Sequence, residues 1–304
     1  MSSSSAPTML ILGGSGFVSG ALSRLALNQG YQVWTVTRGH HALPLGAIGV
    51  NADRRDQAAF QRVIAETGMT WDVVVDSIGY EVEDAVQDLA VFQKLAGHFL
   101  FISTDFVYDP YHRQYPQPED TEFFWKEGYG WKKRLCELEF INNPQTSMPW
   151  TIVRPCYVYG PGSQLGTLPM HRRDPQLISR LRSGEHIRLV GGGHFLQHPI
   201  FVNDLAEVLL SLAGRQNAYG QIYNAGGPEI VEAAGYFKIV ADILGVQLKI
   251  EELSVSAHLA AHPEDAPSCC NRIYDITKLA ASGAAYPSTP LAVGLRQQVD
   301  SMLE

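Results

Sequence analysis

Short apolar runs alternate with amphipathic stretches through the first half of the 304-residue chain. The runs are rich in β-branched side chains, which is typical of strands that are buried on both faces. They predict strands at Met9–Leu12, Val33–Thr37, Ile48–Asn51, Asp72–Asp76, Phe99–Ser103 and Thr151–Arg154. The stretches between them predict helices near 17–29, 56–67, 83–96 and 129–142, the first ending at Gly30 and the last before Pro144. This alternation predicts an α/β fold, a doubly wound parallel sheet with right-handed crossovers.

The second half of the chain differs in composition. Residues 155–175 are rich in Gly, Pro and polar side chains and predict a long functional loop. A strand is expected at Pro199–Val202, followed by a helix that Asn203 or Asp204 caps and that runs to Leu212. A further strand-to-helix unit is expected over 221–244. We therefore expect a sheet domain over 8–154 to which 196–224 returns, a smaller C-terminal substrate lobe from 155–195 and 225–304, and a disordered tail at 1–7.

Composition narrows the class of protein. A net charge of -8 does not favour nucleic acid as a partner. No apolar run approaches the roughly 18 residues of a membrane helix, and Met1–Pro7 lacks the pattern of a secretory signal. The four cysteines have no CxxC spacing, and two of them, Cys269 and Cys270, are adjacent. Reduced thiols and a cytoplasmic location are the expectation.

A glycine-rich turn follows the first predicted strand directly, in the order Gly13-Gly14-Ser15-Gly16-Phe17-Val18-Ser19-Gly20. Glycine allows positive φ and lets backbone approach a pyrophosphate, which the N–H groups of the next helix then bind. A plain tight turn is the alternative, but the position between a first strand and a helix favours dinucleotide binding. We predict that Gly13, Ser15, Gly16, Phe17 and Val18 bind the cofactor. Ser19 occupies the slot of the third glycine.

The end of the second strand bears on the choice of cofactor. Enzymes that prefer NAD usually carry Asp or Glu there, whereas Thr37-Arg38 suits the 2′-phosphate of NADP. NADP is therefore expected, with NAD as the alternative, although Arg38 could instead stack on adenine or lie in solvent. Asp53 follows the third strand and either accepts from the adenine amino group or caps its loop. Arg54 and Ser77 complete the predicted cofactor-binding residues.

Tyr129 and Lys133 are four residues apart and so share one helical face. A nearby ammonium stabilises a phenolate and lowers its pKa, so that the Tyr can exchange a proton with a substrate oxygen. Tyr and Lys on a solvated helix face are the simpler explanation of this spacing alone. However, Thr104 ends the strand 25 residues earlier and could bond the same oxygen, with Ser103 as an alternative, or the pair could cap a loop.

With these motifs, the chain resembles the extended, atypical branch of the short-chain dehydrogenase/reductases, the NAD-dependent epimerase/dehydratase family. The segments that carry the resemblance are LGGSGFVSG, FISTDFVYD, YGWKK, IVRPCYVYGPG, HPIFVNDLAEVLL, QIYNAGGPE and RIYDITKLAASG. The resemblance implies a Rossmann fold, catalysis by Thr104, Tyr129 and Lys133, and a nicotinamide-ribose contact by Lys133. It also implies a homodimer formed through the helices near 83–96 and 129–142.

Departures from the family pattern bear on the substrate. Gln197 stands where many sugar-nucleotide enzymes carry an Arg for the substrate diphosphate, and a second such Arg is not evident near His262, although Arg272 lies further along. This argues against a nucleotide-diphosphate sugar, unless Arg172 and Arg173 compensate.

The expected function is an NAD(P)-dependent oxidoreductase or epimerase. It would transfer hydride at a secondary alcohol or ketone of a sugar-like or other small polar substrate. Phe106 follows Asp105 where dehydratases often carry a second acid, which disfavours dehydration. The segments LILGGSGFVSG, TVTRG and NADRRD also resemble a subgroup that contains RNA-associated chloroplast proteins. An RNA-associated or dinucleotide-sensing, non-catalytic protein is therefore the alternative.

Overall fold

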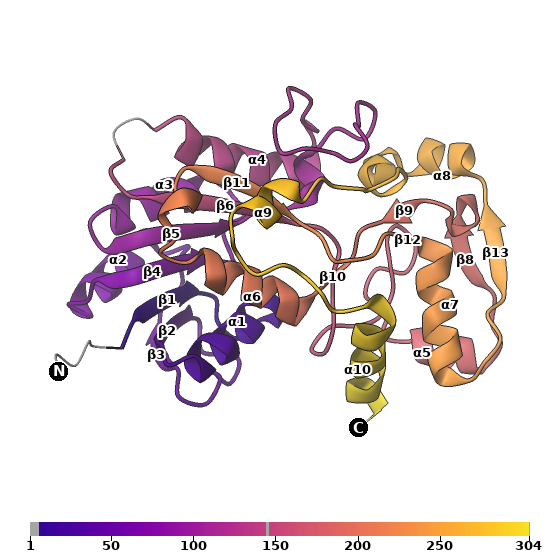
Figure 1. The fold of residues 1–304 in the computed structure, drawn as a ribbon, viewed down its shortest axis with the longest axis horizontal. Coiled ribbons are helices and arrows are strands. Elements are labelled where there is room, and N and C mark those ends of the chain that lie inside the picture. Colours follow the sequence, from indigo (N-terminus) through magenta and orange to yellow (C-terminus); the bar gives the residue numbers. More distant parts are fainter. Residues whose placement is uncertain (1–5, 144–145, 304) are drawn as a thin grey trace.

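The computed structural model describes residues 6–143 and 146–303, so most of the predicted tail and Pro144 lie outside the described residues. Its centre is a seven-stranded parallel sheet in the order β11-β6-β5-β4-β1-β2-β3 (Figure 1). The strands are β1 (Thr8–Leu12), β2 (Gln32–Thr37), β3 (Ile48–Asn51), β4 (Trp71–Asp76), β5 (Ala96–Ile102), β6 (Trp150–Pro155) and β11 (Gln221–Ala225). This is the strand order of a doubly wound, Rossmann-type sheet, which confirms the predicted fold class.

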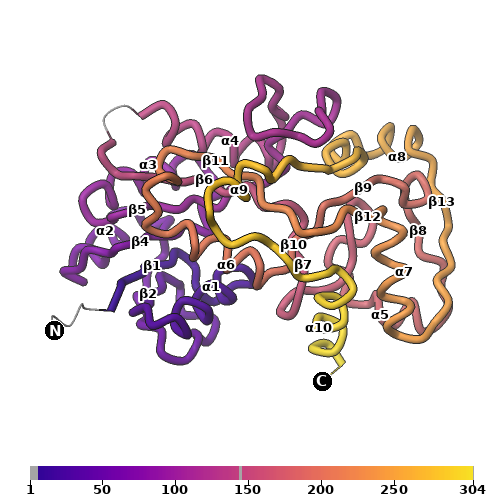
Figure 2. Tube along the Cα trace, viewed as in Figure 1, coloured from indigo at the N-terminus to yellow at the C-terminus, as the bar shows by residue number. Residues whose placement is uncertain are grey.

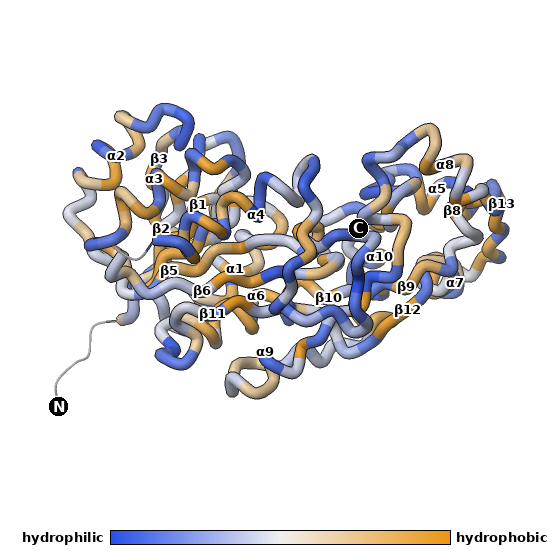
Figure 3. The backbone as a smooth tube through the Cα atoms, turned by 90° about the horizontal axis from the view of Figure 1, so that it is seen from above, coloured by the Kyte–Doolittle hydropathy of each residue, from blue (hydrophilic) through white to orange (hydrophobic). Residues whose placement is uncertain are grey.

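Helices cover both faces of the sheet because successive strand residues point to opposite sides. Met9 and Ile11 of β1 pack with α1 (Phe17–Asn28) and α6 (Val202–Leu212). Leu10 and Leu12 of the same strand pack toward α2 (Gln57–Glu66), α3 (Val82–Phe92) and α4 (Gly128–Ile141). The hydrophobic colour therefore runs along the central strands in Figure 3.

The predicted strands and helices of the first half are confirmed to within a few residues at their ends. The predicted cap of the later helix is wrong, because α6 begins at Val202 and already contains Asn203 and Asp204. The Asp204 carboxylate instead accepts from the backbone N–H groups of Ser288 and Thr289, at 2.9 and 2.8 Å. It therefore fixes the C-terminal segment against the sheet domain.

A second, smaller body holds its own apolar core, built around Leu189, Phe237 and Leu295. Its elements are α5 (Leu177–Arg182), β8 (Ile187–Val190), α7 (Ala233–Leu244), β13 (Ile250–Leu253), α8 (Val255–Ala261) and α10 (Leu291–Leu303). Short pairs connect it to the sheet: β7 (Val158–Tyr159) with β10 (Ile200–Phe201), and β9 (Leu196–Gln197) with β12 (Val231–Glu232). The C-terminal segment runs from α9 (Thr277–Ala281), which lies near β11, to α10 (Figure 2).

Within the described ranges, none of the helices is both long and apolar enough to cross a membrane. All four cysteines are free thiols, as expected from their spacing.

Candidate active site

A cavity of about 540 Å³ opens at the carboxyl ends of β1 and β4. These two strands are neighbours, but the helices that follow them lie on opposite faces of the sheet. A crevice forms where the chain direction divides in this way, and ligands of open α/β sheets bind there. The cavity is lined by the glycine turn, the end of β2, the residues after β3 and the turn after β4.

The glycine turn forms one wall of this cavity. Gly13 and Gly14 have φ of +111° and +88°, and a β-carbon would lie 2.6 Å from the Ser77 hydroxyl at Gly13 and 2.4 Å from Thr35 at Gly14. Only glycine therefore fits at these two positions. Ser19, in the third glycine's slot, is buried and its hydroxyl accepts from the N–H of Gly16 at 3.1 Å. Its small side chain is thus accommodated at the start of α1.

The part of the cavity wall that follows β2 and β3 is basic. Arg38 lines it together with three cationic or titratable residues that the sequence reasoning missed, namely His40, His41 and Arg55. Asp53 lines it as well, and one of its carboxylate oxygens accepts from the N–H of Arg55 at 3.0 Å. Asp53 therefore caps its loop and also lines the cavity, while its contact with an adenine amino group stays a prediction.

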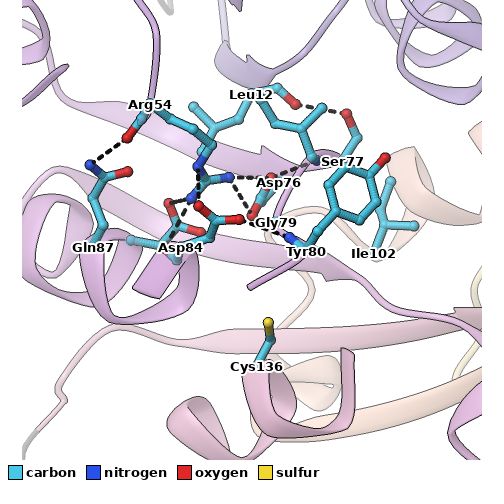
Figure 4. Close-up of polar contacts among 12 residues, drawn as sticks. Leu12, Arg54, Asp76, Ser77, Gly79, Tyr80, Asp84, Gln87, Ile102 and Cys136 are labelled. Atoms are coloured by element: carbon cyan, nitrogen blue, oxygen red, sulfur yellow. Dashed lines mark hydrogen bonds and ion pairs between the residues drawn. The ribbon is translucent and has the colours of Figure 1, made fainter. Parts of the chain in front are cut away.

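Arg54 borders the same cavity, but its guanidinium is engaged by three buried carboxylates (Figure 4). Nη1 donates to both oxygens of Asp76 at 3.1 Å, and Nη2 donates to Asp88 at 2.9 Å. Nε lies 3.2 Å from Asp84. The structure therefore directs this side chain at α3 and the end of β4.

A second cavity, of about 450 Å³, adjoins the first. Val18, Ser77, Tyr80 and Arg173 line both, so the two cavities share a wall. The second cavity is lined by all three predicted catalytic residues, Thr104, Tyr129 and Lys133, although they lie far apart in the chain.

The approach of α4 to the end of β5 depends on Gly130. A β-carbon there would lie 1.9 Å from the backbone oxygen of Phe106, so only glycine allows the helix to pack this closely. Thr104 is extended (φ -157°), and its hydroxyl accepts from the N–H of Phe106 at 3.2 Å. The same contact thus places Tyr129 beside Thr104.

The Tyr129 side chain is 46% exposed and lines the second cavity. Burial of its hydroxyl end and the neighbouring Tyr80 raise its pKa to about 12, against the opposing effects of a hydrogen bond with Thr104 and the positive charge of Arg172. The phenol is therefore protonated at neutral pH and is a proton donor in this state. The lowered pKa expected from a nearby ammonium is wrong for this structure, because burial outweighs the cationic groups.

Lys133 is almost fully buried, and its ammonium donates to the backbone oxygens of Gly79 and Ile102, each at 2.6 Å. Two of its three N–H donors are thereby used. Burial lowers the pKa of Lys133, and the negative charge of Asp76 opposes this effect.

Two neighbouring polar groups are engaged elsewhere. Ser103 donates to Glu137 at 2.5 Å, and Glu137 in turn pairs with Arg154 at 2.7 Å, so Thr104 is the hydroxyl left facing Tyr129. Asp105 accepts from Arg272 at 2.6 Å and from the Tyr274 hydroxyl at 2.6 Å. Its carboxylate is therefore held in a buried ion pair beside the second cavity.

The residues present fit a dinucleotide. The first cavity offers a glycine cradle in its middle and basic groups at one end, and its other end opens on Tyr129 and Lys133. A pyrophosphate would lie at the start of α1, the adenosine would extend toward Arg38 and Asp53, and the nicotinamide would reach the shared wall.

The model of one protein family, described as the NAD dependent epimerase/dehydratase family, matches residues 9–226. The chain belongs to this family. The match covers most of the sequence and extends from β1 to the end of β11, which confirms the resemblance read from the motifs.

Solved structures of other proteins share the fold of this family member. An epimerase from Methanothermobacter thermautotrophicus has a TM-score of 0.81 at 17% identity, over 98% of this chain and 92% of the other. The UDP-glucuronic acid 4-epimerase of Bacillus cereus, solved with UDP-glucuronic acid and NAD, has a TM-score of 0.77 at 18% identity, over 97% and 99% of the two chains. A dTDP-glucose 4,6-dehydratase from Bacillus anthracis, solved with NAD, has a TM-score of 0.78 at 17% identity, over 97% and 96%.

A curated relative is the chloroplast stem-loop binding protein of 41 kDa b from Arabidopsis thaliana. It is 27% identical over an alignment of 256 residues that covers 79% of this chain. The matched region spans 64% of the length of that relative.

Gln197, which we expected at the position of a substrate-binding Arg, is buried in β9 and is not among the residues that line either cavity. Arg172, Arg173 and Arg272 do line the second cavity. Among the residues that the structure describes, the buried Nη1 group of Arg272 has no hydrogen-bond partner. Cationic groups therefore line this cavity, although none of them comes from the position of Gln197.

Proposed function

We propose that this protein is an NAD(P)-dependent oxidoreductase or epimerase that transfers hydride at a secondary alcohol or ketone of a sugar-like or other small polar substrate. The supporting observation is that Thr104, Tyr129 and Lys133 line one cavity, which shares a wall with the cavity of the glycine turn. Family membership supports an NAD-dependent reaction of the epimerase/dehydratase type.

The three residues divide the proton chemistry among them. Thr104 bonds the substrate oxygen and orients it toward the Tyr129 hydroxyl. Tyr129 gives its proton to that oxygen when a carbonyl is reduced, and takes one back when an alcohol is oxidised. Lys133 lies one helical turn away and stabilises the phenolate that forms. The nicotinamide of a bound cofactor supplies the donor and acceptor of the hydride.

Reduction or epimerisation is favoured over dehydration by the state of Asp105. A dehydratase needs a further acid and base beside the substrate hydroxyl, but the Asp105 carboxylate is paired with Arg272 and accepts from Tyr274. Phe106, the next residue, has no titratable group.

We propose NADP as the preferred cofactor, with NAD as the alternative. Thr37 ends β2, and the adjoining cavity wall carries Arg38 and Arg55. Guanidinium groups bind a 2′-phosphate, whereas a carboxylate in this place would bind the ribose hydroxyl. Two of the structural relatives were solved with NAD, which supports dinucleotide use in general.

Native mass spectrometry and one variant test the proposal. The purified protein should retain NADP or NAD, and a trapped substrate would be identified by its mass. Tyr129→Phe should bind the cofactor normally while turnover falls about 10²–10⁴-fold, as for a lost general acid–base. Unchanged turnover in Tyr129→Phe would remove the proposed mechanism.

Similarity to a stem-loop binding protein motivates a second candidate, RNA association. It predicts binding of a structured RNA that weakens steeply with salt and is indifferent to Tyr129→Phe. The net charge of -8 argues against it. Failure to bind a hairpin RNA at low salt would exclude it.

We also propose a homodimer formed through α3 and α4. These helices pack together, and each exposes a large apolar side chain, Val86 (48% exposed) and Ile141 (37%). A single species of monomer mass in sedimentation velocity at micromolar concentration would contradict this assembly.

A further inference from the structure

Four charged side chains lie buried behind the cofactor cavity. Asp76 and Asp88 are 0% exposed, Asp84 is 4% exposed and Arg54 is 7% exposed. Buried charges are costly unless they are paired and hydrogen-bonded. The arrangement must therefore balance its charge within itself and with its nearest neighbours.

A further charge that acts on Asp76 is the ammonium of Lys133. With Arg54 it gives two cations against three carboxylates, one negative charge too many. Burial and the neighbouring Asp76 raise the pKa of Asp88 well above its usual range, and a proton on Asp88 would remove this excess negative charge. A neutral Asp88 leaves two cations facing two anions.

Of the two carboxyl groups of Asp76 and Asp88, that of Asp76 is the ionised one. Burial alone would raise its pKa, but the positive charges of Arg54 and Lys133 lower it. Its oxygens accept from Arg54 at 3.1 Å and from the N–H of Ile78 at 2.8 Å. These bonds stabilise a carboxylate in preference to a carboxylic acid.

Asp76 and Lys133 meet across the peptide of Gly79. Lys133 donates to the Gly79 oxygen at 2.6 Å, and a β-carbon at Gly79 would lie 2.1 Å from Asp76 Oδ2. Figure 4 shows Asp76 and Gly79 side by side. Only glycine at this position lets the carboxylate lie so close to the group that holds the ammonium.

The other surroundings of Lys133 leave Asp76 as its counter-charge. Its Nζ donates to the Ile102 oxygen and lies 4.0 Å from the centre of the Phe101 ring, both of them on β5. It also lies over the ring of Tyr80, in the turn after β4. On its own helix Cys136 is a thiol whose pKa burial raises to about 12. Tyr129, one turn earlier on that helix, is protonated at neutral pH.

Two further charges act on Lys133, but neither is its counter-charge. Glu137, also on α4, is neutralised by ion pairs with Arg154 and Arg134. Arg54 acts on Lys133 with the opposite sign and lowers its pKa.

We propose that Asp76, held by Arg54, is a positioning residue that keeps Lys133 protonated beside Tyr129, while Asp88 carries the proton of the carboxyl pair. The catalytic consequence rests on the proposed function, because it concerns the lysine of that site. The charge state itself does not depend on catalysis. It can be measured in protein without cofactor or substrate.

The test uses ¹³Cε-labelled lysine and NMR titration of the full chain. The sequence holds seven lysines, so the spectrum is sparse, and Lys133→Arg identifies the Lys133 signal by its disappearance. In Asp76→Asn the titration of Lys133 should move to lower pH than in the wild type, because the counter-charge is gone. Asp88→Asn is the matched control: it replaces a neutral acid by a neutral amide, and Lys133 should titrate as in the wild type.

The outcomes separate the alternatives. An unchanged Lys133 titration in Asp76→Asn overturns the proposal, and an equal shift in both variants overturns the assignment of the proton to Asp88. Should Asp76→Asn fail to fold, the wild-type ¹³Cγ signals of the two aspartates decide: near neutral pH, Asp76 should be ionised and Asp88 protonated, and the reverse overturns the proposal. A supported charge state together with normal turnover in Tyr129→Phe would instead refute only the proposed function.

Discussion

Gly130→Ala is the change with the clearest geometric consequence for the site. The added β-carbon would lie 1.9 Å from the Phe106 oxygen, whereas β-carbons essentially never approach within 3.0 Å of another atom. The start of α4 must therefore recede from the end of β5 by about 1 Å, and a displacement of that size in a catalytic group costs about 10²-fold in rate. Since Tyr129 is the adjacent residue and Thr104 lies on the other side of the contact, turnover should fall by that factor.

Gly130→Ala should lower the free energy of unfolding only modestly. Overpacking costs about 1–3 kcal/mol, and replacing a helical glycine by alanine returns about 0.5–1 kcal/mol. The net loss of about 0–2.5 kcal/mol leaves the protein folded, as thermal denaturation would show. The matched control is Gly20→Ala in α1, where the β-carbon meets nothing nearer than the tip of Arg24 at 3.4 Å. Full turnover in Gly130→Ala, measured with a substrate that the wild type converts, would refute the argument that this contact positions Tyr129.

Three further outcomes are expected. Arg38→Ala should weaken NADP binding about 10–100-fold, the value of one charge-assisted contact, and leave NAD binding nearly unchanged; equal losses in calorimetric titrations would contradict its role. Because the pKa of Tyr129 is raised to about 12, carbonyl reduction should be nearly independent of pH around neutrality. Alcohol oxidation, which needs the phenolate, should rise about tenfold per pH unit, and a pH-rate profile without this difference would argue against Tyr129 as the acid–base. Arg272→Met leaves Asp105 buried without its cation and should cost about 3–5 kcal/mol in urea denaturation, so that a loss below about 1 kcal/mol would show the pair to be dispensable.

Local patterns carried the prediction of the sheet and of the catalytic spacing. The apolar runs of β1 to β6 have the composition that buried strands require, and the glycine turn has the backbone freedom that its φ angles demand. The four-residue separation of Tyr129 and Lys133 needs only a helix to place both on one face. These features depend on the chain within a few residues, and so they can be read from it directly.

The partners of the polar groups could not be read in this way. The residues next to Arg54 in sequence do not predict its contacts with three carboxylates 22 to 34 residues away. Those next to Asp105 do not predict its pairing with Arg272, 167 residues later. Ser103 and Thr104 are adjacent and chemically alike, yet one is bound to Glu137 and the other faces Tyr129.

The sequence by itself determined the strands, the helices, the turn that fits a pyrophosphate and the spacing of the proposed acid–base pair, because steric preferences and burial periodicity act between near neighbours. Only the tertiary structure decided which hydroxyl, carboxylate and guanidinium groups remain free to act. A charge interacts with whatever group packing brings within a few ångströms, and that group can come from any part of the chain.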